Sequence, residues 1–269
     1  MNKKLTLGKS VGIALFAVVL VTGGAVKTMA SPFVLNGGFE FTTNGPNAFL
    51  PTLTMPTGWS YDGGVANVAY VYGSGDADTI GGNAGGGIPV YLWGPGNPTN
   101  PTPNINSMNG LTASSPNGGN YLASDSDPSY SGAIYQIING LNPGSEYELT
   151  FWYAAAQFRN TNGTFWNGAT HSLWQVSLGL ETYDTPDLNI IEHGFSGWIY
   201  ESHTFTVPTT SNGSEVLKFL AVGGPGGLPP VALLDGVSLA SVPEPETLAM
   251  LGIGLLGMLA ARRIHKKHA

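Results

Sequence analysis

The stretch Glu201-Ser202-His203-Thr204-Phe205-Thr206-Val207-Pro208 alternates polar and apolar side chains and ends at a proline. Successive side chains of a β-strand point to opposite faces, so the pattern puts Phe205 and Val207 on one face and Thr204 and Thr206 on the other. Proline cannot donate a ladder hydrogen bond, and the strand therefore ends there. We expect a strand with one face in a core and the other in water.

Seven more runs with strand chemistry stand between turn signals in the middle of the chain. Their ranges are 65–72, 88–93, 133–138, 147–155, 173–180, 216–222 and 231–239, and the run quoted above extends back to 198. No stretch keeps a 3.6-residue apolar period for three turns, so helix is scarce. This pattern predicts an all-β domain, a jelly-roll β-sandwich, rather than a parallel α/β sheet.

Two segments between these strands have turn or loop chemistry. In Leu141-Asn142-Pro143-Gly144, proline presets φ and glycine allows positive φ, which predicts a type II turn before the strand at Tyr147. The Gly-, Pro- and Asn-rich stretch 73–119 predicts a long loop or insertion, and loops of that length are usually functional or disordered.

Both ends of the chain have the composition of export signals. Three lysines precede an apolar run at 11–21, and Thr28-Met29-Ala30 supplies small residues for signal peptidase, so residues 1–30 are predicted to be a signal peptide that forms a helix. The alternative is a permanent anchor, for which the run is short. At the other end, Pro243-Glu244-Pro245 leads into an apolar run at 248–261 and a basic cluster.

The tail at 242–269 resembles the PEP-CTERM sorting signal in all three of its parts. The resemblance implies recognition of Pro243, Glu244 and Pro245 by an exosortase-type peptidase. A 14-residue helix spans about 21 Å, less than the hydrocarbon core of a bilayer, which suits a transient membrane insertion through 248–261. The basic cluster stays inside, so the domain lies outside. We expect export across the inner membrane to the cell surface or the extracellular space.

Removing the two ends makes the remaining domain, residues 31–241, strongly acidic. It keeps two basic residues, Arg159 and Lys218, against fifteen Asp and Glu residues, a formal balance of −13. Nucleic-acid binding needs a basic patch that two isolated cations cannot form. The absence of cysteine excludes disulfides and thiolate chemistry. Neutral sugars and divalent cations fit this charge.

Two motifs at opposite ends of the domain, Asn36-Gly37-Gly38-Phe39-Glu40 and Leu233-Leu234-Asp235-Gly236-Val237, are accompanied by Gln136 between them. Together they resemble galactose-binding-like jelly rolls of carbohydrate-binding modules. The resemblance implies that the first and last strands are neighbours. It also implies a structural Ca²⁺ held by Glu40 and Asp235, although Gly236 replaces a frequent second aspartate.

The acidic composition also offers two carboxylate pairs at i and i+2, Asp76/Asp78 and Asp125/Asp127. Calcium prefers six to eight such oxygen ligands. The simpler interpretation of both pairs, which we favour, is solvated turn residues.

A sugar site needs aromatic faces and a few polar groups. Trp93 and Trp174 lie in or beside polar loops, whereas the contexts of Trp59, Trp152 and Trp198 indicate core or strand positions. The strongest candidate segment is 158–167. The predicted ligand-binding residues are Trp93, Arg159, Asn160, Asn162, Phe165 and Trp166.

No motif of a hydrolase, metalloprotease or nucleotide-binding enzyme occurs in the domain, and His171, His193 and His203 are each isolated. We expect a non-catalytic protein that binds exopolysaccharide or serves as a structural part of a biofilm matrix. The alternative is a secreted glycoside hydrolase or other carbohydrate-active enzyme, because two carboxylates suffice for that reaction.

Overall fold

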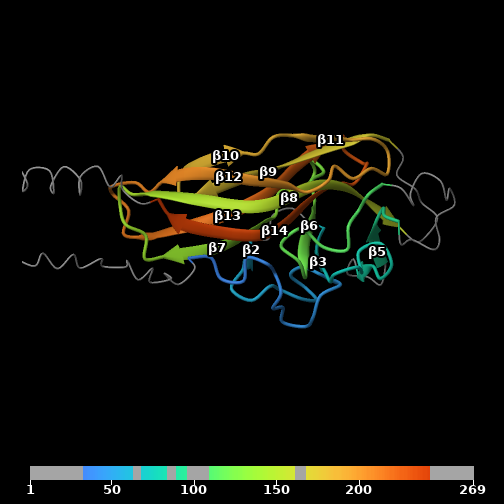
Figure 1. The fold of residues 1–269 in the computed structure, drawn as a ribbon, viewed down its shortest axis with the longest axis horizontal. Helices are drawn as coiled ribbons and strands as arrows, with labels where there is room; N and C mark the ends of the chain where they lie inside the picture. Colours follow the sequence, from blue (N-terminus) through green and yellow to red (C-terminus); the bar gives the residue numbers. More distant parts are fainter. Residues whose placement is uncertain (1–32, 63–67, 84–88, 96–108, 161–167, 243–269) are drawn as a thin grey trace, which may run out of the picture. The chain divides into compact units, whose positions relative to one another are not determined.

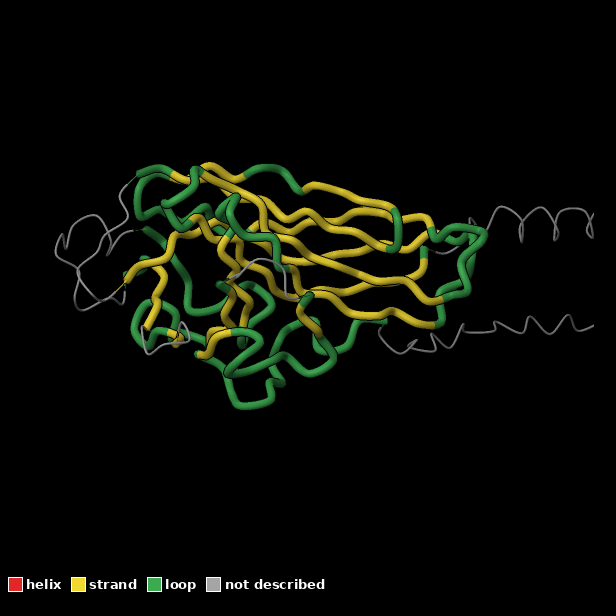
Figure 2. Tube along the Cα trace, turned by 180° about the vertical axis from the view of Figure 1, so that it is seen from behind, coloured by secondary structure: helices red, strands yellow, loops and turns green. Residues whose placement is uncertain are grey.

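The computed structural model describes residues 33–62, 68–83, 89–95, 109–160 and 168–242. Within these ranges every regular element is a β-strand, as the tube in Figure 2 shows. No helix in the described part is long and apolar enough to cross a membrane. The predicted signal helix at 1–30 and the tail after residue 242 lie outside the described residues.

Eight strands form the first sheet, sheet A, in the order β1-β3-β6-β14-β8-β5-β4, with β12 paired to β8. Figure 1 labels β3, β5, β6, β8, β12 and β14 of this sheet. Neighbouring strands are antiparallel. Their bounds are β1 Ala48–Phe49, β3 Ala69–Tyr72, β4 Gly82–Asn83, β5 Pro89–Leu92, β6 Tyr121–Asp125, β8 Glu146–Asn160, β12 Ile199–Thr206 and β14 Pro230–Ser241.

Six strands form sheet B in the order β10-β9-β13-β7-β2, with β11 paired to β9. This sheet is also antiparallel. Its strands are β2 Ser60–Tyr61, β7 Ala133–Asn139, β9 Thr170–Leu178, β10 Glu181–Asp184, β11 Leu188–Ile190 and β13 Ser214–Gly224.

The connectivity of the two sheets is that of a jelly roll. The chain changes sheet at every step from β6 to β9 and again from β11 to β14, which gives β6-β14-β8-β12 in one sheet and β7-β13-β9-β10 in the other. Each of the eight predicted strands is present. The predicted all-β jelly-roll β-sandwich is therefore confirmed.

The main core lies between the sheets, where the alternating apolar side chains of both meet. On β12, Phe205 is fully buried while Thr204 and Thr206 are exposed, as the alternation predicts. Trp174 also belongs to this core, which corrects its placement beside a polar loop. Its indole N–H donates to the Leu233 carbonyl at 2.9 Å, so β9 of sheet B is joined to β14 of sheet A.

A second core lies on the other side of sheet A. The central strands of this sheet are apolar on both faces, and residues such as Tyr70, Ala123 and Val231 point away from sheet B. Ala77, Leu92 and Leu111 pack over them. The stretch 73–119 is therefore not only a loop: its described parts contain β4 and β5 and cover sheet A, while 84–88 and 96–108 lie outside the described residues.

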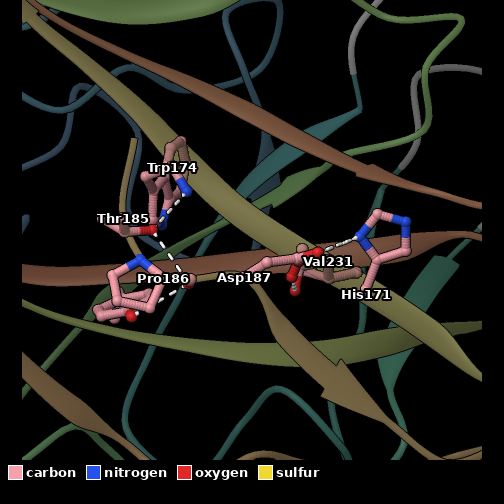
Figure 3. A network of polar contacts seen from close by, with 8 residues as sticks. His171, Trp174, Thr185, Pro186, Asp187 and Val231 are labelled. Carbon is pink, nitrogen blue, oxygen red and sulfur yellow. Dashed lines mark hydrogen bonds and ion pairs between the residues drawn. The ribbon is translucent and has the colours of Figure 1, made fainter. Parts of the chain in front are cut away.

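Polar contacts tie the edge of sheet B to the sandwich (Figure 3). The backbone N–H of Trp174 donates to the Thr185 hydroxyl at 3.0 Å, and the Tyr153 hydroxyl donates to the Pro186 carbonyl at 3.2 Å. The segment between β10 and β11 is thereby fixed to both sheets.

Candidate functional site

The Asn36–Glu40 motif folds against the last strand, as its resemblance implies, but as a turn rather than a strand. The N–H of Val237 donates to the Gly37 carbonyl at 3.0 Å, and a Cβ on Gly37 would lie 1.9 Å from the Val237 carbonyl oxygen. Only glycine fits this close approach. The Trp59 indole donates to the Asn36 carbonyl at 3.0 Å and holds the turn in place.

Gln136 on β7 holds the residue before this motif. Its side-chain carbonyl accepts the Leu35 N–H at 2.7 Å, and its amide donates to the Leu35 carbonyl at 3.0 Å. The Gln136 side chain thus makes the two backbone hydrogen bonds with Leu35 that a neighbouring strand would otherwise make. These bonds hold the start of the domain against sheet B.

Asp235 lies at a β-bulge in β14, where the register shifts before Ser238. Gly236 adopts a positive φ of 62°, and its N–H donates to Asp235 Oδ1 at 2.6 Å. Asp235 is opposite Trp152 of β8 and fully buried on the side of sheet A that faces away from sheet B. The bulge therefore places a carboxylate in a buried position.

The loop 115–120 contacts both predicted metal-binding carboxylates, of which Asp235 is buried and Glu40 exposed. The Ser115 hydroxyl donates to Asp235 Oδ2, and the Asn117 amide lies 3.4 Å from Oδ1. The N–H of Asn120 donates to Glu40 Oε1 at 3.0 Å. Sequence reasoning missed this loop because nothing in its Gly- and Asn-rich composition indicates which distant carboxylates it contacts.

Glu40 and Asp235 share one small region around Gly38. A Cβ on Gly38 would lie 3.7 Å from Asp235 Oδ1 and 3.8 Å from Glu40 Cγ. Burial, with a smaller contribution from the Glu40 charge, raises the pKa of Asp235 to about 7 against the opposing effect of the hydrogen bonds from Ser115, Gly236 and Asn117. A buried carboxylate beside a second carboxylate is stabilised by a cation, so these two residues fit a hard metal ion.

The other carboxylate pairs are not solvated as we expected, because Asp78, Asp125 and Asp127 are buried, and their contacts are structural. Asp127 accepts the N–H groups of Ser129 at 2.8 Å and Gly227 at 2.5 Å, and Asp76 accepts the Asn47 amide at 2.6 Å. In the described part of the chain, no three His, Asp or Glu side chains are arranged to hold a metal ion.

The structure brings Trp93 and Arg159 together but does not expose them. The Arg159 guanidinium lies 4.6 Å from the ring centroid of Tyr91 and 5.7 Å from that of Trp93, and Trp93 stacks on His193 at 3.7 Å. Trp93 is 1% exposed and Arg159 3%. Neither presents an open face to a sugar, which corrects the expected role of both.

The remaining predicted ligand residues lie at the end of β8 or after it in the sequence. Asn160 is the last residue of β8. Asn162, Phe165 and Trp166 lie outside the described residues.

A partly exposed aromatic pair is found elsewhere, on the outer side of sheet A, where Trp152 is half-buried and Tyr200 is exposed. Trp152 of β8 and Tyr200 of β12 are directly opposite in register, with ring centroids 5.1 Å apart, and Tyr200 is 54% exposed. Trp198 precedes Tyr200 by two residues and its indole donates to the Thr112 hydroxyl at 3.0 Å. The sequence context indicated core or strand positions for Trp152 and Trp198. It did not show that they lie on the outer side of sheet A, because sequence context does not distinguish the two faces of a strand.

Polar side chains continue this face beyond the aromatic pair. Glu148, Ser202 and Thr204 are exposed there, and the Ser202 hydroxyl donates to the Glu148 carboxylate at 2.6 Å. Aromatic rings thus stand beside hydroxyl and carboxylate groups on one open surface.

Two of the histidines join neighbouring elements. His171 Nδ1 lies 2.9 Å from the Asp187 carboxylate, next to β11 (Figure 3). His203 on β12 stacks on Tyr183 of β10 at 3.9 Å, and the Tyr183 hydroxyl donates to Glu201 at 2.8 Å. These contacts hold edge strands together.

The chain is similar at low sequence identity to a known archaeal protein. Halomucin of Haloquadratum walsbyi is 25% identical over 240 residues, which are 85% of this chain and 2% of halomucin. The chain thus spans a very small part of that protein.

Among solved structures, a cyclase from Fischerella sp. TAU aligns over 79% of this chain and 96% of its own, with 16% identity and a TM-score of 0.41. The carbohydrate-binding module TmCBM61, solved with β-1,4-galactotriose, aligns over 79% and 100% with 15% identity and a TM-score of 0.34. A CBM4 module aligns over 78% and 99% with 14% identity and a TM-score of 0.33. Similarity at this level does not identify a ligand.

The C-terminal tail gives a direct match. Residues 241–264 match the PEP-CTERM protein-sorting motif, in agreement with the Pro243-Glu244-Pro245 signal and the apolar run and basic residues behind it. The chain therefore carries a PEP-CTERM sorting signal, which marks it for export and sorting to the cell surface.

Proposed function

We propose that this exported protein is a non-catalytic module that binds a neutral polysaccharide of the cell surface or extracellular matrix. The observation that supports it best is the Trp152–Tyr200 pair, a partly exposed aromatic surface on sheet A. Pyranose rings stack on such surfaces, and nearby hydroxyl and carboxylate groups such as Ser202 and Glu148 fix sugar hydroxyls. The balance of −13 over residues 31–241 favours an uncharged polymer over an anionic one.

A glycan array probed with the full-length protein in detergent tests the proposal. We expect hits among neutral glycans, and Tyr200→Ala should weaken them by about tenfold or more. Phe41→Ala is the matched control, because Phe41 is 71% exposed on a different part of the domain. A wild-type protein that binds no glycan would favour a purely structural role, and equal losses in both variants would exclude the aromatic pair as the site.

We further propose that Glu40 and Asp235 hold a structural Ca²⁺. The support is the buried Asp235 carboxylate beside Glu40, enclosed by the loop 115–120. A metal ion there would connect the first motif, β14 and this loop without taking part in a reaction. At a hundredfold excess over its Kd, a ligand of the folded state alone stabilises by about 2.7 kcal/mol.

Thermal unfolding in Ca²⁺ and in chelator measures this contribution. The melting temperature of the wild type should rise with Ca²⁺, and Glu40→Gln should reduce the rise. Glu148→Gln, a change at an exposed carboxylate on the open face, should leave it intact. An identical melting temperature in Ca²⁺ and chelator would exclude a structural ion.

A glycoside hydrolase is the alternative from another class. Asp235, whose pKa burial raises to about 7, lies beside Glu40, and the two have the chemistry of an acid and its partner carboxylate. We rank it second because Asp235 is fully buried and bonded to Ser115, so a sugar oxygen has no access to it. Turnover of a chromogenic glycoside that disappears in Asp235→Asn would reverse this ranking.

A further inference from the structure

The hydrogen-bonded ladder of sheet A continues to the residue before the sorting motif. Strand β14 ends at Ser241, and the backbone N–H of Val242 still donates to the Glu146 carbonyl at 2.9 Å. Pro243 follows directly and, as a proline, has no N–H with which to extend the ladder. The sorting motif is therefore joined to the folded domain without a spacer.

Three turns lie together at this end of the sandwich, 140–145 between β7 and β8, 207–213 between β12 and β13, and 179–180 between β9 and β10. Backbone hydrogen bonds connect them. The Gly144 N–H donates to the Val207 carbonyl at 2.8 Å, and the Gly179 N–H donates to the Val216 carbonyl near the start of β13 at 3.0 Å. The first turn leads directly into β8, whose first residue is bonded to Val242. We call these turns, with the strand ends beside them, the tail end of the domain.

The tail end presents carboxylates and one apolar side chain. Glu146 begins β8 and Glu181 begins β10, and both are exposed, while Glu215 on β13 follows the turn 207–213. The three turns contain no Lys, Arg or His. Leu180 is 93% exposed beside Glu181. A protein surface with basic groups around an apolar contact is complementary to this arrangement.

An enzyme that binds Pro243 must also touch the tail end. Consecutive Cα atoms are about 3.8 Å apart, so Pro243 lies within that distance of Val242. Val242 is bonded to β8, and Thr206 of β12 is paired with Glu146 on the other side of β8. Two strand spacings come to about 10 Å, and even a single helix of an enzyme is about 10 Å wide. The neighbouring strand ends are therefore covered when the motif is bound.

We propose that the exosortase-type peptidase implied by the sorting motif docks on the tail end through a basic surface while it binds Pro243-Glu244-Pro245. This inference rests on the sorting function of the tail and adds a second recognition element, in the folded domain. Because Glu146 and Glu181 come together only when both sheets have formed, docking also distinguishes a folded domain from an unfolded chain.

Other partners fit the tail end less well. Its three turns contain no aromatic residue on which a sugar ring could stack. A second copy of the chain would bring the same carboxylates, and like charges repel each other. The tail end is thus separate from the Trp152–Tyr200 pair and from the proposed sugar binding.

The rate at which the full-length chain loses its tail tests the proposal. We would measure it by pulse–chase in cells that contain the sorting peptidase and in matched cells that lack it. Glu146→Lys should slow processing by about tenfold, because it reverses a charge at the docking surface. Glu192→Lys is the matched control: Glu192 is exposed, and the N–H of the next residue, His193, is bonded to Gln157 near the far end of β8.

A flexible Gly/Ser spacer of about ten residues between Val242 and Pro243 provides a second comparison. Such a spacer spans about 17 Å on average, so the peptidase can bind the motif while the domain lies away from it. In the chain with the spacer, Glu146→Lys should therefore be processed as fast as its parent. Circular dichroism must show that Glu146→Lys keeps the wild-type fold, and Glu146→Gln replaces it if it does not.

The possible failures separate docking from sorting. Equal processing of the wild type and Glu146→Lys without the spacer would overturn the docking proposal and leave the sorting function in place. A spacer that speeds processing of the wild type would also overturn it, because the tail end would then obstruct the enzyme. A wild-type chain that keeps its tail in cells containing the peptidase would overturn both.

Discussion

The backbone N–H of Val237 donates to the carbonyl of Gly37 at 3.0 Å, across 200 residues of sequence. The contact joins the turn at the Asn36–Glu40 motif to the last strand, β14. The two backbones meet without an intervening side chain. Gly37 belongs to the same motif as Glu40, and Val237 to the same strand as Asp235, so this contact supports both the fold and the proposed metal site.

Gly37→Ala should therefore destabilise the domain. The new Cβ would lie 1.9 Å from the Val237 carbonyl oxygen, and relieving this overlap costs about 3 kcal/mol, as for other overpacked sites. Gly226→Ala is the control, since its Cβ would meet no atom closer than 3.5 Å. Urea unfolding measures both, and equal stabilities would show that the turn moves freely.

Gly119→Ala should lower stability more than Gly118→Ala does. Both glycines have positive φ, 65° and 86°, so both substitutions carry the same kind of backbone strain, about 1 kcal/mol. Only at Gly119 would the Cβ overlap the Glu40 carboxylate, 1.7 Å from Oε1. Gly119→Ala should also weaken Ca²⁺ binding in calorimetry. Equal effects of the two changes on both measurements would contradict this arrangement of the loop.

Asp125→Asn should change how stability depends on pH. Burial raises the pKa of Asp125 to about 7 from an ordinary 3.8, so the folded state holds the proton more tightly than the unfolded chain does. The stability due to this group is complete below about pH 4 and is lost as the pH rises through about 7.

The variant should therefore be more stable than the wild type at pH 8, by up to roughly 4 kcal/mol, with a smaller difference at pH 4. The asparagine carbonyl can still accept the Asp127 N–H, which lies 2.9 Å from Asp125 Oδ1. Asp184→Asn, at an exposed position, serves as control in urea unfolding across this range. Parallel pH profiles of Asp125→Asn and the wild type would contradict the buried acid.

Trp174→Phe should cost about 2–3 kcal/mol, because it removes the indole bond to the Leu233 carbonyl and leaves a cavity between the sheets. Trp152→Phe, at a half-buried outer position, should cost less than about 1 kcal/mol. Thermal and urea unfolding of the two variants compare these positions directly. A larger loss for Trp152→Phe would mean that the outer aromatic pair supports the fold.

Local patterns in the sequence predicted much of the architecture. Alternation on β12 placed Phe205 inward and Thr204 outward, and Asn142-Pro143-Gly144 predicted a turn in which Gly144 indeed has a φ of 82°. Strand β6, Tyr121–Asp125, was missed because its residues are buried on both faces of the sheet and show no period of two. The expected long loop was only partly a loop, because its apolar residues cover sheet A.

The sequence by itself determined the properties that depend on residue order and composition: strand periodicity, turn chemistry, the acidic balance and the sorting motif. Only the tertiary structure decided which side chains meet. It buried Trp93, Trp174 and Arg159, left Trp152 and Tyr200 on an open face, and enclosed Asp235 beneath Ser115. The physical reason is that a strand's periodicity separates its two faces but does not say what covers each one, since the covering segments come from distant parts of the chain.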